Sequence, residues 1–149
     1  MLSLVALLAA STTVLGATLP ASTTATPATA CTTGTPTTTA GFPISFYVKA
    51  TPASSSFAQG YEPEPAWASQ HLVGTNTFGV PDPVESGFAY AQFKCQYYCD
   101  DKSQGGSFFV RADGDVGSYC SCYDKLIDPK AFVNSNQTLV GAWNSICTD

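Results

Sequence analysis

The chain has 149 residues, of which 11% are charged, and its formal net charge of −5 corresponds to a pI near 4.5. Nucleic acids and anionic membranes offer little attraction to such an acidic surface, so the composition argues against both as partners. The length leaves room for one domain with a modest core.

The N-terminal segment predicts export. Residues 1–17 form a short apolar run that ends in small residues, as a secretory signal peptide does. The run is shorter than the roughly 20 residues that a spanning helix needs, and no hydrophobic tail closes the chain. We therefore expect a secreted protein, extracellular or at the cell wall, with no membrane anchor in the mature chain.

Residues 18–40 predict a disordered stalk that precedes a domain at residues 41–149. The segment is rich in Ser, Thr and Pro and carries no charge, so it cannot bury enough apolar surface to offset the entropy of ordering it. This composition is typical of an O-glycosylated stalk, and an unmodified tail is the alternative.

The first half of the domain predicts short strands. Residues 44–49 combine Ile, Phe, Tyr and Val, which favour extended structure. Residues 50–87 are dense in proline and glycine, which forbids a long helix and leaves two short strands at residues 71–73 and 77–80.

The second half predicts a helix followed by a hairpin. Residues 88–101 should form the main helix, because apolar residues recur there at three- and four-residue intervals: Phe88, Ala91, Cys95, Tyr98 and Cys99. Residues 107–111 and 118–123 should pair as strands around a turn at residues 112–117. We therefore expect an α+β fold, a small disulfide-stapled domain with one main helix packed on a short antiparallel sheet.

The six cysteines predict disulfides, because their number is even and the chain is expected to be exported: Cys31, Cys95, Cys99, Cys120, Cys122 and Cys147. Cys95 and Cys99 are one helical turn apart, a distance of about 6 Å along the helix. Cys120 and Cys122 are two residues apart on a strand, a distance of about 6.6 Å. These two pairs should therefore bond to each other, which leaves Cys31 for Cys147.

The order of the two middle bonds has two solutions. The nested order joins Cys95 to Cys122 and Cys99 to Cys120, and we favour it because a helix that turns back into a hairpin usually brings near positions together first. The crossed order is the alternative. A zinc site is disfavoured, because zinc pairs usually follow C-x-x-C and an oxidising compartment opposes thiolates, so no metal is expected.

The sequence offers little for catalysis. His71, the sole histidine, has no G-x-S-x-G nucleophile segment to serve. Two acidic pairs could supply an acid and a base for glycoside hydrolysis, Glu62 with Glu64 and Asp113 with Asp115. The first pair alternates with prolines in an extended turn, and the second flanks a turn glycine that accounts for at least one of its members. No phosphate loop or complete calcium loop is present. We predict no catalytic residue and no cofactor.

Aromatic residues are better candidates for a functional site, since they form 12% of the chain and are more numerous than one small core readily buries. Four of them could line a ligand groove through their flat, amphipathic rings: Tyr97, Trp67, Tyr61 and Trp143. Core packing is the competing role for each. Tyr97 is the strongest candidate, because it projects away from the helix face that carries the cysteines. Separately, the triplet Asn136, Gln137 and Thr138 predicts N-glycosylation of Asn136 in an exposed loop.

The cysteine-bearing helix FKCQYYCDD, the hairpin SFFVRADGDVGSYCSCYDKL, and Cys31 and Cys147 at the ends of the domain together resemble the PAN/Apple family. The likeness is to the divergent PAN-like domains of small secreted fungal cysteine-rich proteins, and it covers residues 88 to about 132. It implies paired terminal cysteines, nested bridges between helix and sheet, and a binding module without catalysis.

We therefore expect a secreted, non-catalytic recognition or adhesion module that binds an extracellular protein or a cell-wall polysaccharide. A structural or host-directed, effector-like protein without glycan binding is the alternative hypothesis. A small hydrolase that uses acidic residues is the third.

Overall fold

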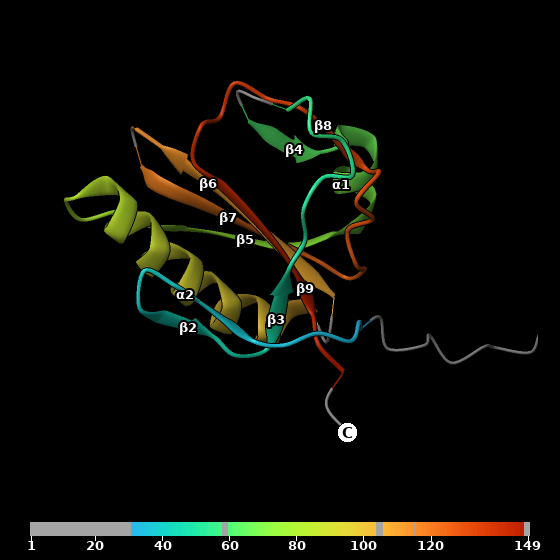
Figure 1. Cartoon of the computed structure of the whole chain (residues 1–149), viewed down its shortest axis with the longest axis horizontal. Helices are drawn as coiled ribbons and strands as arrows, with labels where there is room; N and C mark the ends of the chain where they lie inside the picture. The colour runs from blue at the N-terminus through green and yellow to red at the C-terminus, as the bar shows by residue number, and fades with distance from the viewer. Residues whose placement is uncertain (1–30, 58–59, 104–105, 115, 148–149) are drawn as a thin grey trace, which may run out of the picture.

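The computed structural model describes residues 31–57, 60–103, 106–114 and 116–147 (Figure 1). The predicted signal peptide and residues 18–30 of the predicted stalk lie outside this part of the chain. The α+β class and the antiparallel sheet are confirmed. The elements follow in the order β1 (Thr37–Thr39), β2 (Phe42–Ile44), β3 (Tyr47–Lys49), β4 (Tyr61–Pro63), α1 (Pro65–His71), β5 (Leu72–Phe78), α2 (Val84–Ser103), β6 (Ser107–Asp113), β7 (Gly117–Tyr123), β8 (Phe132–Asn134) and β9 (Val140–Ser145).

Among the described residues, five strands form the main sheet in the order β3-β9-β6-β7-β5, and all neighbours are antiparallel. β6 and β7 make the predicted hairpin, with Asp113 opposite Gly117 at its turn. β9 inserts between β3 and β6, so the C-terminal part of the chain lies in the middle of the sheet. Two smaller sheets pair β1 with β2 and β4 with β8.

The sheet separates α2 from the group formed by α1, β4 and β8, which lies on the opposite side (Figure 1). Alternate residues of each strand therefore face different cores. The core on the α2 side contains Phe108, Val110 and Trp143 together with the four middle cysteines. The core on the other side contains Phe109 and Tyr123.

The disulfide order corrects our prediction. Cys31 is joined to Cys147 as expected, but Cys95 is joined to Cys120 and Cys99 to Cys122, which is the crossed order rather than the nested one. The cause is chain direction. β6 runs back after α2, and β7 reverses again, so β7 advances in the same direction as α2 along the bonded pairs. The nested order would have suited the first strand after the helix, and the cysteines are on the second.

Several predicted boundaries also change. The domain begins before residue 41, because β1 and Cys31 belong to it, so the last ten residues of the predicted stalk are part of the fold. The single strand predicted at residues 44–49 is two strands, β2 and β3. Gln96 of α2 fixes the turn between them: its Oε1 accepts from the backbone N–H of Ser45 at 2.9 Å, and its Nε2 donates to the carbonyl oxygen of Pro43 at 2.7 Å. The two strands predicted at residues 71–73 and 77–80 are the single strand β5, which has an irregularity in its register between Leu72 and Gly74.

Candidate functional site

A groove of about 340 Å³ is lined by residues of the main sheet and of the β4–α1 segment. This segment lies on the side of the sheet away from α2 (Figure 1). We call the groove the sheet-face groove. One wall comes from β6 and β7, and the other from β4 and α1. Its lining residues are Glu62, Pro63, Pro65, Ala68, Phe109, Arg111, Tyr119, Ser121 and Tyr123. This volume is at the lower end of the range typical of small-molecule sites, roughly 300–1,000 Å³.

Strand alternation places the sheet wall of the groove. Arg111 and Phe109 are two residues apart on β6, and they lie opposite Tyr119 and Ser121 of β7 in the register of the hairpin. The intervening residues of both strands face α2. The guanidinium carbon of Arg111 lies 5.3 Å from the centroid of the Tyr119 ring, within the range of a cation–π contact. A half-buried cation is therefore held against an aromatic surface.

Tyr123 is the most perturbed titratable group of the groove. Burial raises its pKa from 10.0 to about 12, while a side-chain hydrogen bond with Ser121 lowers it. The negative charge of Glu62 adds to the rise in pKa, and the positive charge of Arg111 opposes it. Both charges therefore act on the Tyr123 hydroxyl. At neutral pH this hydroxyl is protonated and can donate or accept a hydrogen bond.

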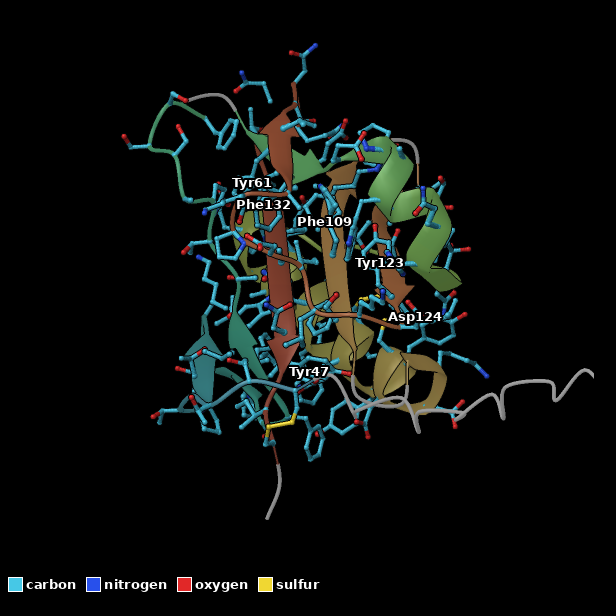
Figure 2. All side chains as sticks on the ribbon, turned by 90° about the vertical axis from the view of Figure 1, so that its right-hand side faces the viewer. Tyr47, Tyr61, Phe109, Tyr123, Asp124 and Phe132 are labelled. Atoms are coloured by element: carbon cyan, nitrogen blue, oxygen red, sulfur yellow. A yellow bond between two sulfur atoms is a disulfide. The ribbon has the colours of Figure 1, made fainter. Side chains whose placement is uncertain are left out.

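Two of the predicted ligand contacts, Tyr61 and Trp67, are not among the lining residues of the groove, but their rings contact residues that are. The Trp67 ring lies 5.0 Å from that of Tyr123, and the Tyr61 ring lies 6.4 Å from that of Phe109 and 5.0 Å from that of Phe132. Figure 2 shows Tyr61, Phe132 and Phe109 as neighbours, with Tyr123 beside them on the sheet. The two predicted residues therefore pack against the aromatic residues of the groove, Phe109 and Tyr123.

Trp143, the fourth predicted contact, is packed in the core on the α2 side. It is 2% exposed, its ring stacks on Phe108 at 6.1 Å, and its Nε1 donates to Oε1 of Gln92 at 3.1 Å. Burial on the α2 side satisfies both its apolar ring and its polar N–H. Its small exposed part lies in the lining of a pocket of about 490 Å³ bordered by β1 and α2, so ligand contact by Trp143 stays a prediction.

Tyr97 lies on a separate surface. It is 48% exposed on α2, and its ring contacts those of Phe93 at 5.2 Å and Phe46 at 5.8 Å. Phe42 and Tyr90 continue this group, which we call the α2 aromatic cluster. The sheet stands between this cluster and the groove. The structure thus separates the predicted aromatic contacts: Trp67 packs beside the groove, Tyr61 lines a different cavity, Tyr97 lies on α2 and Trp143 lies in the core.

Three of the four acidic residues considered for catalysis are described, and they belong to different elements: Glu62 to β4, Glu64 to the start of α1 and Asp113 to β6. Glu64 is the N-cap of α1: its carboxylate accepts from the backbone N–H groups of Trp67 at 2.7 Å and Ala66 at 3.0 Å, and these bonds lower its pKa. Asp113 ends β6 at the hairpin turn, and Asp115 lies outside the described residues. His71 is 2.9 Å from a carboxylate oxygen of exposed Asp124, through Nδ1.

Three of the middle cysteines have the spacing of a metal site. The sulfur atoms of Cys95, Cys99 and Cys120 all lie within 4.8 Å of one another. Each is already bonded to another sulfur, however, and metal coordination by cysteine requires the thiolate. The cluster is therefore a covalent staple between α2 and β7.

Sequence reasoning missed Arg111, Tyr119, Ser121 and Tyr123 as site residues. The signal was present in the predicted hairpin, whose cysteine-bearing face implies an opposite face made of these four residues. The residues of the β4–α1 wall could not be predicted as site residues, because Pro63 and Pro65 indicate a turn in that segment.

Comparisons of the chain with protein-family models, with curated proteins and with solved structures gave no match. The resemblance to the PAN/Apple family therefore stays a prediction. Within the described part of the chain, no helix combines the length and the apolar character that crossing a membrane requires.

Proposed function

We propose that the protein is a secreted recognition domain that binds a carbohydrate in the sheet-face groove. The observation that carries this proposal is the meeting of Arg111 and Glu62 with aromatic walls in one small groove. A sugar presents apolar C–H faces and a rim of hydroxyl groups, so it needs both kinds of surface at once. A purely apolar ligand would leave most of the hydrogen-bonding capacity of both charged groups unused, because the guanidinium faces the Tyr119 ring and the carboxylate accepts one long bond, of 3.5 Å, from the Ser135 hydroxyl.

Each polar group of the groove has a place in such binding. Arg111 can donate to sugar hydroxyls, Glu62 can accept from them, and the hydroxyls of Ser121 and Tyr123 can do either. Bonds that involve a charged group are the stronger ones, so Arg111 and Glu62 should dominate affinity. The ring of Tyr119, already covered on one side by the guanidinium, gives the site its apolar surface.

Binding suits the groove better than hydrolysis. Glycosidases commonly place two carboxyl groups across the scissile bond. Among the described residues that line this groove, Glu62 is the one carboxylate, and the neighbouring Glu64 is occupied by the backbone of α1. We therefore retain recognition as the proposal and treat the hydrolase as its rival.

The disulfides support the export that this proposal requires. Every cysteine is oxidised in the structure, and the bond from Cys31 to Cys147 closes the domain at both ends. Proteins of this kind normally reside outside the cytosol, where disulfides persist. The expected ligand is accordingly a polysaccharide of the cell wall or a glycan of an extracellular partner.

The test measures retention of the secreted protein on insoluble cell-wall polysaccharides and on a glycan array. Arg111→Ala should weaken binding about 10- to 100-fold, the equivalent of losing one hydrogen bond to a charged group. Glu62→Gln and Tyr119→Ala should weaken binding as well. Lys94→Ala is the matched control, because it also removes one cation near a tyrosine ring, at Tyr90 on the far side of the sheet.

The outcomes separate the hypotheses. Loss of binding in the groove variants, with Lys94→Ala and Tyr97→Ala unchanged, supports the groove. Loss in Tyr97→Ala alone would move recognition to the α2 aromatic cluster. If the protein is retained on no polysaccharide or glycan, carbohydrate recognition is wrong and the structural or host-directed role takes its place.

A further inference from the structure

A second and larger cavity, of about 640 Å³, opens beside the predicted glycosylation triplet. We call it the sequon cavity. Its walls combine two aromatic rings with both outer residues of the triplet, and its lining residues are Lys49, Phe57, Gly60, Tyr61, Asn136, Thr138 and Val140. Asn136 and Thr138 are both exposed. The attachment atom for a glycan is therefore at the edge of a ready-made aromatic hollow.

The loop that carries the triplet is fixed to the start of β4. The backbone N–H of Ser135 donates to the carbonyl oxygen of Gly60 at 3.1 Å, and the N–H of Gln137 donates to Oγ of Ser135 at 3.3 Å. Gly60 has φ of 141°, and a side chain there would collide with the carbonyl oxygen of Gln137. This close approach holds Asn136 at the rim of the cavity.

We propose that Asn136 carries an N-linked glycan whose first N-acetylglucosamine packs into the sequon cavity against Phe57 and Tyr61. In the attachment step, the amide nitrogen of Asn136 bonds to C1 of a lipid-linked oligosaccharide. The bond from C1 to the diphosphate oxygen breaks, and the amide nitrogen gives up one proton. The proposal requires export but does not depend on ligand binding in the sheet-face groove, which is a different cavity.

The cavity favours a tethered sugar over a free one. Phe57 and Tyr61 are both half-buried, so each ring keeps part of its surface open toward the cavity. Covering such rings with the C–H face of a sugar removes apolar surface from water. The Lys49 ammonium can donate to the sugar oxygens from the same wall. Covalent attachment raises the effective concentration of the first sugar ring, so it occupies the hollow ahead of any dissolved saccharide.

The experiment compares three forms of the protein secreted from a host that adds high-mannose glycans. The first is intact, the second is trimmed by endoglycosidase H to a single N-acetylglucosamine, and the third is stripped by peptide N-glycosidase F. Intact mass verifies each form. The intact and trimmed forms should share one melting temperature, and the stripped form should melt lower by a shift on the order of 4 °C.

Two kinds of variant make the result specific. Stripping converts Asn136 to aspartate, so Asn136→Asp and Asn136→Gln, which carry no glycan, control for the added charge and should match the stripped form. Phe57→Ala should abolish the difference between its own trimmed and stripped forms. Because both forms carry the same substitution, the background stability of the variant cancels. Phe57→Leu, a milder change, should reduce the difference.

The proposal is overturned if secreted protein carries no glycan at Asn136, or if trimmed and stripped forms melt together. It is equally overturned if the difference persists undiminished in both Phe57 variants, because the stabilisation would then come from elsewhere. A difference that disappears with Phe57→Ala supports it.

Discussion

Raising the pH above 10 should destabilise the fold through Tyr123. The pKa of this residue is raised from 10.0 to about 12, mainly because its ring is buried, with 3% of its surface exposed. Between these two values the unfolded chain loses the phenolic proton and the folded chain keeps it. The stabilising effect of the neutral hydroxyl is therefore fully present below pH 10 and is lost as the pH rises through the folded-state pKa.

The size of the loss follows from the shift. One pKa unit corresponds to about 1.36 kcal/mol, so a rise from 10.0 to about 12 amounts to roughly 2.7 kcal/mol of unfolding free energy. This is a large fraction of the roughly 5–15 kcal/mol that stabilises a typical domain.

Urea unfolding at fixed pH values from 8 to 12 provides the measurement, made soon after each pH change so that the disulfides stay intact. Tyr123→Phe removes the titrating hydroxyl, and its stability should fall less steeply than that of the unaltered protein across this range. The other titrating groups are common to both proteins, so they cancel in the comparison. Ser121→Ala removes the hydrogen bond that lowers the Tyr123 pKa. This variant should therefore lose more unfolding free energy over the same pH range than the unaltered protein does.

Parallel stability curves for the unaltered protein and Tyr123→Phe would refute the reasoning. They would mean that the Tyr123 hydroxyl reaches water in the folded state. The polar groups of the sheet-face groove would then be better hydrated than their burial implies, and the expected affinity for a sugar would be correspondingly weaker.

Two further predictions concern the covalent and polar links of α2. Partial reduction with stepwise alkylation, followed by non-reducing peptide mapping, should find Cys95 joined to Cys120, and recovery of any other partner for Cys95 would contradict the chain direction described above. Gln96→Leu should cost about 1–3 kcal/mol in urea unfolding, because it removes two hydrogen bonds, to the N–H of Ser45 and the carbonyl of Pro43. A cost below about 0.5 kcal/mol would show that water replaces the amide.

The helix and the hairpin could be predicted because local patterns specify them. The three- and four-residue spacing around Cys95 identifies α2, and the turn at Asp113 identifies the reversal between β6 and β7. β9 gave no such signal. It is buried along most of its length and contains Gly141 and Ala142, so it lacks the alternation of a half-exposed strand. Its position in the sheet depends on long-range pairing, which no local window contains.

The candidate site was only partly predictable for the same reason. Tyr61 and Trp67 attract attention as large aromatic residues, yet their exposure depends on what packs against them. Trp143 shows this most clearly, since its N–H donates a hydrogen bond to Gln92 of α2 and its ring is buried in the core. The residues that form the groove are individually ordinary, and it is the meeting of two segments far apart in sequence that makes them a site.

The disulfides and the groove belong to the same strand. Along β7, Cys120 and Cys122 alternate with Tyr119, Ser121 and Tyr123, so each groove residue of this strand is next to a cysteine bonded to α2. The disulfides are on the face of β7 that is directed toward α2, and they restrain the backbone that positions the side chains on the groove face. A groove whose walls are fixed before binding loses less conformational entropy when it takes a ligand. The cysteine spacing therefore bears on recognition as well as on stability, because two covalent bonds to α2 restrain the β7 wall of the site.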